Sequence, residues 1–315
     1  MKEFSQGAIM SSTRYSVLIL GHGEMGRTME YLLSGHHDLT MWEKNLEDGS
    51  ENLPLEDAVA GRDFILFMLH ANPHCELALR IRDQMAPACL CLSVAKGLDG
   101  MGRTPASVLA TVLGEHRRFG MIYGPMISEE LLAGHPGFAD LGTRREEDFR
   151  RAARLFAHTG LHVRHTTDLE GISWSVILKN VYVPLLGAAD ALELGDNARG
   201  FLVTEAFREI DRIVEMKGGR RGTAYGLAGL GDLVTTGTSR GSLHRRVGRE
   251  LVQGNLDSIR TGSKVHVEGL HTLAMIEQFG LLNLDDFPLM KLMRDMRADP
   301  RDIAGKFRGY LQSCF

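Results

Sequence analysis

The feature that most constrains the fold is a glycine-rich turn that joins an apolar run to a helical pattern. Residues 15–20 read YSVLIL, typical of a buried parallel strand, and residues 21–26 read GHGEMG and open a helix. In such a unit the three glycines permit a tight turn, a close approach by a pyrophosphate, and close packing of helix on strand. Dinucleotide binding is therefore favoured over a plain glycine turn, with the pyrophosphate at the helix N-terminus. The predicted cofactor contacts are Gly21, Gly23, Glu24, Met25 and Gly26.

A second predicted strand, residues 38–42, ends immediately before two residues of opposite charge. Glu43 follows the glycine motif by about 20 residues, where a carboxylate can bind the ribose hydroxyls of the adenosine. That position favours NAD, whereas the neighbouring Lys44 can meet the 2′-phosphate of NADP. A solvated loop charge is an equal alternative for Glu43. The expected cofactor is therefore NAD or NADP, with NAD slightly favoured.

Strand and helix patterns alternate through the first half of the chain. Further strands are predicted at residues 63–69, 88–94, 119–124, 137–142 and 161–165, with helical segments between them. This alternation predicts an α/β fold with a doubly wound, mostly parallel sheet. No convincing strand pattern follows. We therefore expect a flexible tail at residues 1–13, a dinucleotide-binding Rossmann domain at 14–168 and an all-α domain at 169–315.

Lys96 comes directly after the fourth predicted strand, in the segment SVAKGL. Ligands bind beyond the carboxyl ends of the strands in such sheets. Lys96 is therefore placed to touch cofactor or substrate. The alternative is a surface lysine that caps a strand end.

Composition limits the classes of partner. The chain has 315 residues and a formal net charge of −4, so it lacks the basic surface of a nucleic-acid-binding protein. Its four cysteines, Cys75, Cys89, Cys91 and Cys314, form no metal-spaced cluster, so we expect no metal and reduced thiols in a cytoplasmic protein. No signal peptide or membrane-spanning run is visible, so we expect no membrane insertion. A homodimer is compatible with the sequence, which does not fix the oligomeric state.

A long apolar helix is predicted at the start of the second half. Residues 171–197 read GISWSVILKNVYVPLLGAADALELGDN, with near-helical apolar spacing that predicts burial on most sides. Lys179 and Asn180 lie in its middle. Burial of an unpaired ammonium is costly, so Lys179 either reaches the surface, pairs with a carboxylate, or acts in proton transfer with a pKa tuned by burial. The helix pattern alone slightly favours the structural alternatives.

A glycine-rich segment further on surrounds an acidic residue. Residues 225–236 read YGLAGLGDLVTT, and three glycines close to Asp232 indicate backbone that approaches another group tightly. Asp232 is either a helix N-cap or an active-site carboxylate. The last two helices are predicted to start at Pro288 and Pro300, each after an acidic cap.

Several segments occur together in an order that carries a resemblance. They are GHGEMG (21–26), VAKGL (94–98), YGP (123–125), WSVILKNVY (174–182), LGDNAR (194–199), GLAGLGDLVTT (226–236), RRVG (245–248) and VEG (267–269). In these segments the chain resembles the bacterial type of NAD(P)-dependent glycerol-3-phosphate dehydrogenase. The resemblance implies a Rossmann domain, an all-helical C-terminal domain, and interconversion of dihydroxyacetone phosphate and sn-glycerol 3-phosphate.

The resemblance also implies roles for single residues. The implied catalytic set is Lys179, Lys96, Asn180, Asp232 and Thr236. Within this set Lys179 resembles the proton-transferring lysine and Lys96 the second substrate lysine. Glu268 resembles a cofactor contact near the nicotinamide. The other expected substrate contacts are Gly124, Arg240, Ser242 and His244.

The chain also departs from the family pattern. Leu243 and His244 stand where the family has Arg-Asn, and that arginine serves phosphate and cofactor recognition. Tyr123 replaces a small polar residue, and Glu24 stands where a small or hydroxyl side chain often lies by the pyrophosphate. The third strand ends at His70 without the usual proline.

Three functional interpretations follow. The favoured one is an NAD(P)-dependent oxidoreductase of the family type, with Lys179 as proton donor or acceptor. A divergent dehydrogenase that acts on another small ketone or keto acid is kept open by Leu243, unless Arg240 has taken over the phosphate. A catalytically silent dinucleotide-binding protein is opposed by the joint retention of Lys96, Lys179 and the residues around them.

Overall fold

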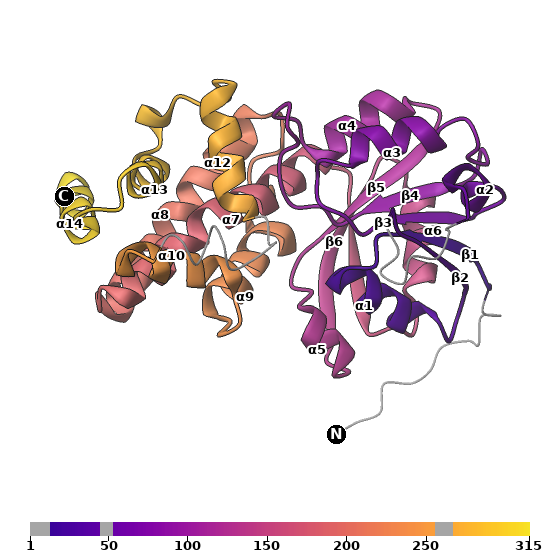
Figure 1. Cartoon of the computed structure of the whole chain (residues 1–315), viewed down its shortest axis with the longest axis horizontal. Helices are drawn as coiled ribbons and strands as arrows, with labels where there is room; N and C mark the ends of the chain where they lie inside the picture. Colours follow the sequence, from indigo (N-terminus) through magenta and orange to yellow (C-terminus); the bar gives the residue numbers. More distant parts are fainter. Residues whose placement is uncertain (1–12, 45–52, 256–266) are drawn as a thin grey trace.

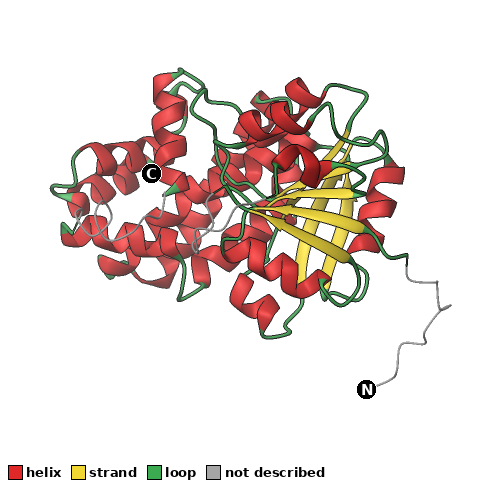
Figure 2. Cartoon of the chain, turned by 45° about the vertical axis from the view of Figure 1, so that its right-hand side comes forward, coloured by secondary structure: helices red, strands yellow, loops and turns green. Residues whose placement is uncertain are grey.

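The computed structural model describes residues 13–44, 53–255 and 267–315 (Figure 1). A sheet flanked by helices forms the N-terminal part, and helices alone form the part beside it (Figure 2). The flexible tail predicted at residues 1–13 falls, apart from Thr13, outside the described residues.

The sheet has seven strands in the order β2-β1-β3-β4-β5-β6-β7. They are β1 (Ser16–Leu20), β2 (Asp38–Trp42), β3 (Phe64–Phe67), β4 (Leu90–Ser93), β5 (Arg118–Tyr123), β6 (Gly137–Thr143) and β7 (Leu161–Thr166). Neighbouring strands run parallel except β5 and β6, which are antiparallel. The predicted mostly parallel sheet is confirmed.

Helices cover both faces of this sheet. They are α1 (Glu24–Leu33), α2 (Leu55–Val59), α3 (His74–Ile81), α4 (Pro105–Leu113), α5 (Ser128–Leu132) and α6 (Glu146–Leu155). Apolar residues of α1, α5 and α6 pack on one face, and those of α2, α3 and α4 pack on the other. Successive strand residues alternate between these two cores, so β1, β3 and β4 read as continuous apolar runs.

Beyond Thr166 the described residues form helices and turns without a further strand. The helices are α7 (Leu169–Ala191), α8 (Gly195–Met216), α9 (Asp232–Thr238), α10 (Leu243–Gln253), α12 (Glu268–Gln278), α13 (Pro288–Ala298) and α14 (Ile303–Ser313). A π-helical turn, η2 (Leu227–Gly231), runs directly into α9. The predicted fold class, an α/β Rossmann domain followed by an all-α domain, is confirmed.

Helix α7 is the centre of the helical part. Every residue from Gly171 to Ala189 is buried. By length and composition α7 resembles a membrane span, but the apolar stretch is completely buried inside the protein. A Cβ atom on Gly187 or Gly248 would collide with the backbone of Arg245 or Pro184, so α10 crosses α7 at very short range. This crossing fixes α10 relative to the C-terminal third of α7.

The last two helices differ from the prediction, one in its cap and the other in its first residue. Helix α13 begins at Pro288 as predicted, but its acidic cap is Glu209 of α8, whose carboxylate accepts bonds from the first backbone amides of the helix. Helix α14 does not begin at Pro300. It begins at Ile303, because the Asp302 carboxylate accepts the Gly305 N–H and caps the helix there.

Candidate active site

Lys179 lies in the middle of α7, with only 4% of its side chain exposed. Its Nζ is 3.2 Å from Oδ2 of Asp232 and donates a hydrogen bond of 3.0 Å to Oγ1 of Thr236. Nζ of Lys96 is 2.8 Å from the same Asp232 oxygen. Two ammonium groups therefore share one carboxylate, and the alternative of a lysine that reaches the surface is wrong. We call these four residues the lysine centre.

Three elements bring the lysine centre together. Lys96 follows β4, at the carboxyl edge of the sheet, and Lys179 comes from α7. Asp232 is the first residue of α9, and Thr236 lies one helical turn later, where its hydroxyl donates to Oδ1 of Asp232 at 3.2 Å. Asp232 is therefore not the cap of α9. The N-cap of α9 is Gly231, so the carboxylate of Asp232 can face the two lysines.

The electrostatics of the lysine centre lower the pKa of its buried amine. Burial is the main cause that brings the pKa of Lys179 to about 8; the positive charge of Lys96 adds to it, and Asp232 opposes it. Burial disfavours ionisation of Asp232, but the ammonium groups of Lys179 and Lys96 outweigh it and hold the pKa of Asp232 below its usual range. Lys179 can therefore be protonated or neutral close to neutral pH.

The backbone that carries Lys96 is held by side chains on both sides. The Tyr123 hydroxyl donates to the Ala95 carbonyl at 2.8 Å, and the Ala95 N–H donates to Oγ of Ser93 at 3.1 Å. Nε2 of His74 lies 2.8 Å from the same Ser93 hydroxyl. Sequence reasoning did not predict these contacts. A buried tyrosine hydroxyl needs a partner, so Tyr123 was the available signal.

Asn180 and Glu268 lie beside the lysine centre. Nδ2 of Asn180 is 3.4 Å from the Lys96 carbonyl and donates to Oε2 of Glu268 at 3.2 Å. The other Glu268 oxygen, Oε1, is 3.0 Å from Nδ1 of His70, and this bond raises the pKa of His70. Within the described residues Oδ1 of Asn180 is buried without a hydrogen-bond partner. The His70 contact was missed, although the sequence marked the loss of proline there.

The start of α10 and the turn before it hold three of the expected substrate contacts. Oγ of Ser242 caps the helix by accepting the Arg245 N–H at 3.2 Å. Within the described residues Nδ1 of His244 is buried without a partner, and burial together with the charge of Lys179 lowers the pKa of His244 to about 3. Leu243 packs against the apolar core. Arg240 is exposed on the preceding turn, and among the described residues no hydrogen bond or ion pair joins it to Lys179.

Gly124, predicted as a substrate contact, lies in a tight turn against β6. Its φ is +156°, and a Cβ atom there would collide with the backbone of Phe138 and Ala139 in β6. The following Pro125 accepts the Phe138 N–H at 3.0 Å. Glycine is therefore required so that this turn can lie against β6.

The glycine turn after β1 fits a dinucleotide. Gly21 has φ +95°, and a Cβ atom there would lie 2.7 Å from the Met68 carbonyl oxygen. A Cβ atom on Gly26 would collide with the Gly21 carbonyl, whereas nothing lies within 4 Å of one on Gly23. The turn is therefore closed on the sheet side and open at Gly23, where a pyrophosphate can approach the first amides of α1. Met25 packs against the core, and Glu24 is exposed in the first turn.

Glu43 and Lys44 follow β2 at the same edge. Glu43 is partly buried next to the turn, because the Gly21 N–H donates to the carbonyl of Trp42 at 2.8 Å. Lys44 is exposed, with its Nζ 3.6 Å from Oε1 of Glu76. The ammonium of Lys44 thus has an acidic partner on α3.

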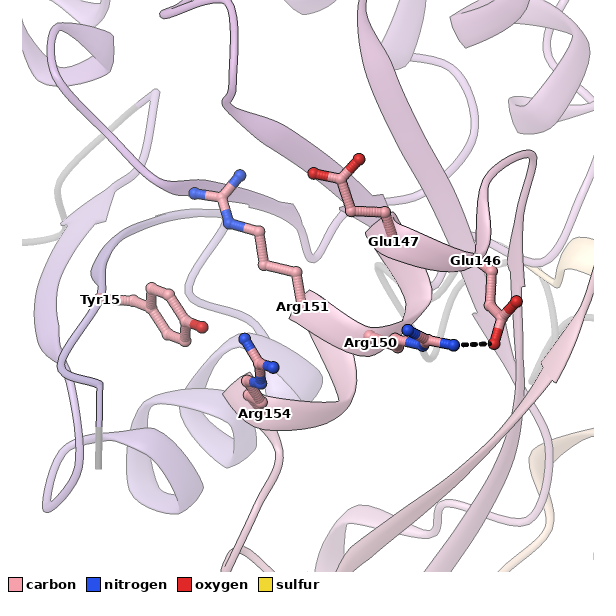
Figure 3. Close-up of a pocket in the computed structure, with 6 residues that line it drawn as sticks. All are labelled: Tyr15, Glu146, Glu147, Arg150, Arg151 and Arg154. Atoms are coloured by element: carbon pink, nitrogen blue, oxygen red, sulfur yellow. Dashed lines mark hydrogen bonds and ion pairs between the residues drawn. The ribbon is translucent and has the colours of Figure 1, made fainter. Parts of the chain in front are cut away.

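A separate hollow of about 490 Å³ lies beside α6 (Figure 3). Its lining residues are Tyr15, Glu146, Glu147, Arg150, Arg151 and Arg154. Arg150 pairs with Glu146 at 2.7 Å and Arg151 with Asp63 at 2.8 Å. Tyr15 precedes β1, so this hollow is at the amino end of the strand, away from the glycine turn. It is not part of the candidate site.

Comparison with known proteins points to one enzyme family. Residues 168–301 match the family model described as NAD-dependent glycerol-3-phosphate dehydrogenase C-terminus. The chain is 32% identical over 288 residues to the glycerol-3-phosphate dehydrogenase (NAD(P)+) of Dechloromonas aromatica, covering 83% of this chain and 87% of the relative. A second relative, from Sphingopyxis alaskensis, is 29% identical over 329 residues, covering 95% and 97%.

Solved structures agree in fold. The glycerol-3-phosphate dehydrogenase of Coxiella burnetii has a TM-score of 0.82 at 23% identity, covering 95% of this chain and 99% of that one. The enzyme of Saccharomyces cerevisiae has a TM-score of 0.78 at 20% identity, covering 93% and 98%. The sequence match and the shared fold extend over both the sheet and the helical part. The chain therefore belongs to the NAD(P)-dependent glycerol-3-phosphate dehydrogenase family.

Proposed function

We propose that the chain interconverts dihydroxyacetone phosphate and sn-glycerol 3-phosphate with NAD or NADP, and that Lys179 transfers the proton. The observation that carries this proposal is the buried amine of Lys179, held 3.2 Å from Asp232 beside Lys96. Family membership supports the reaction and the cofactor class. The open side of the glycine turn at Gly23 supports binding of the dinucleotide.

The chemistry assigns each residue a separate task. The nicotinamide, when bound, supplies the hydride for the ketone carbon. The ammonium of Lys179 stabilises the charge that develops on the ketone oxygen and donates a proton to it. In the opposite direction the neutral amine of Lys179 accepts the hydroxyl proton. A pKa of about 8 lets one residue serve both directions.

The neighbours of Lys179 hold it in place and tune it. Asp232 fixes both ammonium groups, and without it burial and the charge of Lys96 would lower the pKa of Lys179 further. Thr236 accepts one N–H of Lys179, which orients the remaining N–H bonds. Asn180 lies next to this centre with a free amide oxygen within the described residues, where it suits a substrate hydroxyl.

Recognition of the phosphate is where this chain differs from its family. An arginine–phosphate bond contributes roughly 1.5–3 kcal/mol, which Leu243 cannot supply. Arg240 is exposed on the turn before α10 and is the cation that we assign to the phosphate. The buried, neutral His244 adds no positive charge. Leu243 and His244 therefore favour a second candidate function, in which the enzyme reduces another small ketone or keto acid.

The choice of cofactor and the setting of the enzyme belong to the same proposal. A carboxylate at Glu43 favours NAD, because it would repel the 2′-phosphate of NADP, and Lys44 lies near Glu76 instead. The four cysteines, all within the described residues, are free, which supports a reducing cytoplasmic location.

The test is oxidation of NADH and NADPH by the purified protein with dihydroxyacetone phosphate and a panel of small ketones and keto acids. Turnover of dihydroxyacetone phosphate is expected, together with a rise in its KM of about tenfold in Arg240→Ala, equal to 1.4 kcal/mol. An unchanged KM would reject the role of Arg240. Turnover of other ketones only would replace the substrate by the second candidate.

A further inference from the structure

We propose that Asp140 of β6 positions the lysine centre by capping, from the sheet, the helix that carries Asp232 and Thr236. This role rests on the proposed function, in which Asp232 orients Lys179. Asp140 would thus be a residue of the sheet that helps to position the lysine centre. Asp140 would act through Asp232 and would touch neither substrate nor cofactor.

The contacts of Asp140 are specific and buried. Its side chain is 5% exposed, and Oδ2 accepts the Ala228 N–H at 3.1 Å. Arg164 of β7 donates twice to the other oxygen, Oδ1, at 3.0 and 2.9 Å. The arginine therefore fixes one carboxylate oxygen and leaves the other for the helix amide. A Cβ atom on Gly226 would lie 2.8 Å from Oδ2, so the turn is pressed onto the carboxylate.

The capped helix is the one that delivers Asp232. The π-helical turn η2 starts one residue before Ala228 and continues without a break into α9. The first amides of a helix have no partner within it, and a carboxylate there gains both hydrogen bonding and a favourable interaction with the helix dipole. The Gly231 N–H bonds the Gly226 carbonyl at 3.1 Å, the wide spacing of a π turn.

A π turn sets the direction in which the next residue points. Adding or losing one residue in such a turn rotates all that follow by about 100° around the helix axis. Asp232 comes directly after the turn, so its contact with both lysines depends on the turn keeping this form. A Cβ atom on Gly231 would lie 3.3 Å from Cγ of Pro125, so the last residue of the turn also lies close to the segment that joins β5 and β6. Loss of the Asp140 cap would free the first end.

The pKa of Lys179 reports whether loss of the Asp140 cap displaces Asp232. The charged and titratable groups that act on this amine are Asp232, Lys96, Glu268 and the neighbouring His244. Only the carboxylates raise the pKa of Lys179, and Asp232 is the closest of them. If Asp232 turns away, the pKa of Lys179 must fall, while a general loss of stability would leave it unchanged. This separates a positioning role from a structural one.

The matched control is Asp148 of α6, a carboxylate of equal burial in the same sheet domain. Its side chain is 4% exposed and pairs with Arg118 at 2.8 Å, and among the described residues no hydrogen bond or ion pair joins its carboxylate to η2 or α9. Asp140→Ala and Asp148→Ala thus each remove a buried aspartate from an arginine pair. Asp140→Asn keeps an acceptor oxygen for the Ala228 N–H and is the conservative variant.

The experiment measures the pKa of Lys179 by NMR titration of ¹³C-labelled lysine, assigned with Lys179→Arg, and kcat in the same variants. In Asp140→Ala the pKa should fall by roughly one unit. The value of kcat should fall at least about tenfold, because a displacement of about 1 Å in an active site can cost 10²-fold. Asp140→Asn should keep most of the wild-type pKa of Lys179 and most of the wild-type kcat. Asp148→Ala should leave the pKa of Lys179 and kcat unchanged.

A wild-type pKa and kcat in Asp140→Ala, or equal losses in Asp148→Ala, would overturn the proposal. If Asp140→Ala does not fold, Arg164→Met replaces it, because that side chain is 63% exposed. Arg164→Met should lower the pKa of Lys179 and kcat by less than Asp140→Ala would. A wild-type pKa and kcat in Arg164→Met would overturn the proposal. Failure of the wild type to reduce dihydroxyacetone phosphate would reject the proposed substrate only, since the NMR titration needs no substrate.

Discussion

The glycine turn and the lysine centre are built in opposite ways. The turn is formed by a single segment, Gly21–Gly26, whose shape depends on its own glycines and on Met68 below it. The lysine centre joins residues far apart in sequence, since Lys96 and Asp232 are separated by 136 positions. Steric contacts of its own residues therefore set the shape of the glycine turn, whereas the geometry of the lysine centre depends on the packing of whole helices. We therefore expect substitutions in the lysine centre to lower kcat and substitutions in the glycine turn to weaken cofactor binding.

Replacement of Lys179 should give the largest effect on the chemistry. Lys179→Met removes the proton donor and should lower kcat by about 10² or more, the scale of general acid catalysis. The Kd of the cofactor should change little, because Lys179 is not part of the turn. Kinetics and cofactor titration measure both quantities.

Lys217→Met is the matched control, since this lysine is also partly buried and bonds the Leu281 carbonyl at 2.6 Å. Its kcat should stay close to that of the wild type. Near-normal turnover in Lys179→Met would remove the residue from the mechanism.

Substitution in the glycine turn should show the reverse pattern. Gly23→Ala adds a methyl group where the protein itself leaves open space, so the melting temperature without cofactor should not change. The methyl group would occupy the path of the pyrophosphate and should weaken cofactor binding about tenfold, equal to 1.4 kcal/mol.

Gly35→Ala, which also meets nothing within 4 Å, is the control for the added methyl group. Calorimetry and cofactor titration distinguish the two variants. Equal cofactor affinity in both would mean that the pyrophosphate does not lie at Gly23.

The smallest effect is expected at Glu43, on the rim of the cofactor site. Glu43→Ser removes the charge that repels a 2′-phosphate, so the ratio of kcat/KM for NADH to that for NADPH should fall a few-fold, about 1 kcal/mol. Lys44→Ser, which removes the neighbouring exposed charge, should leave the ratio unchanged or raise it. A wild-type preference for NADPH would contradict the role of Glu43.

The same contrast explains what could be predicted from the sequence. The alternating strands, the glycine turn and α7 follow from local periodicity, which is why these elements were found. The set of residues around Lys179 came from family resemblance, because spacing along one helix cannot identify a partner such as Asp232. His70 was noted as a departure, but its contact with Glu268 joins positions 198 residues apart.

Caps supplied from elsewhere in the chain could not be predicted from local sequence. Helix α13 uses Glu209, which lies 80 residues before Leu289, instead of an acidic neighbour. The π turn before Asp232 likewise uses Asp140, which lies 88 residues before Ala228. Local rules predict that a helix start needs an acceptor, but they do not say which element provides it.

The most direct test of the account is the pH dependence of kcat/KM in both directions, because this parameter reports groups of the free enzyme. Lys179 must be protonated for ketone reduction and neutral for alcohol oxidation. With a pKa of about 8, reduction should decline and oxidation should rise as the pH increases through that value. Lys217→Met should keep both midpoints. Opposite slopes with one shared midpoint are the predicted result, and midpoints that persist in Lys179→Arg would contradict the role of Lys179.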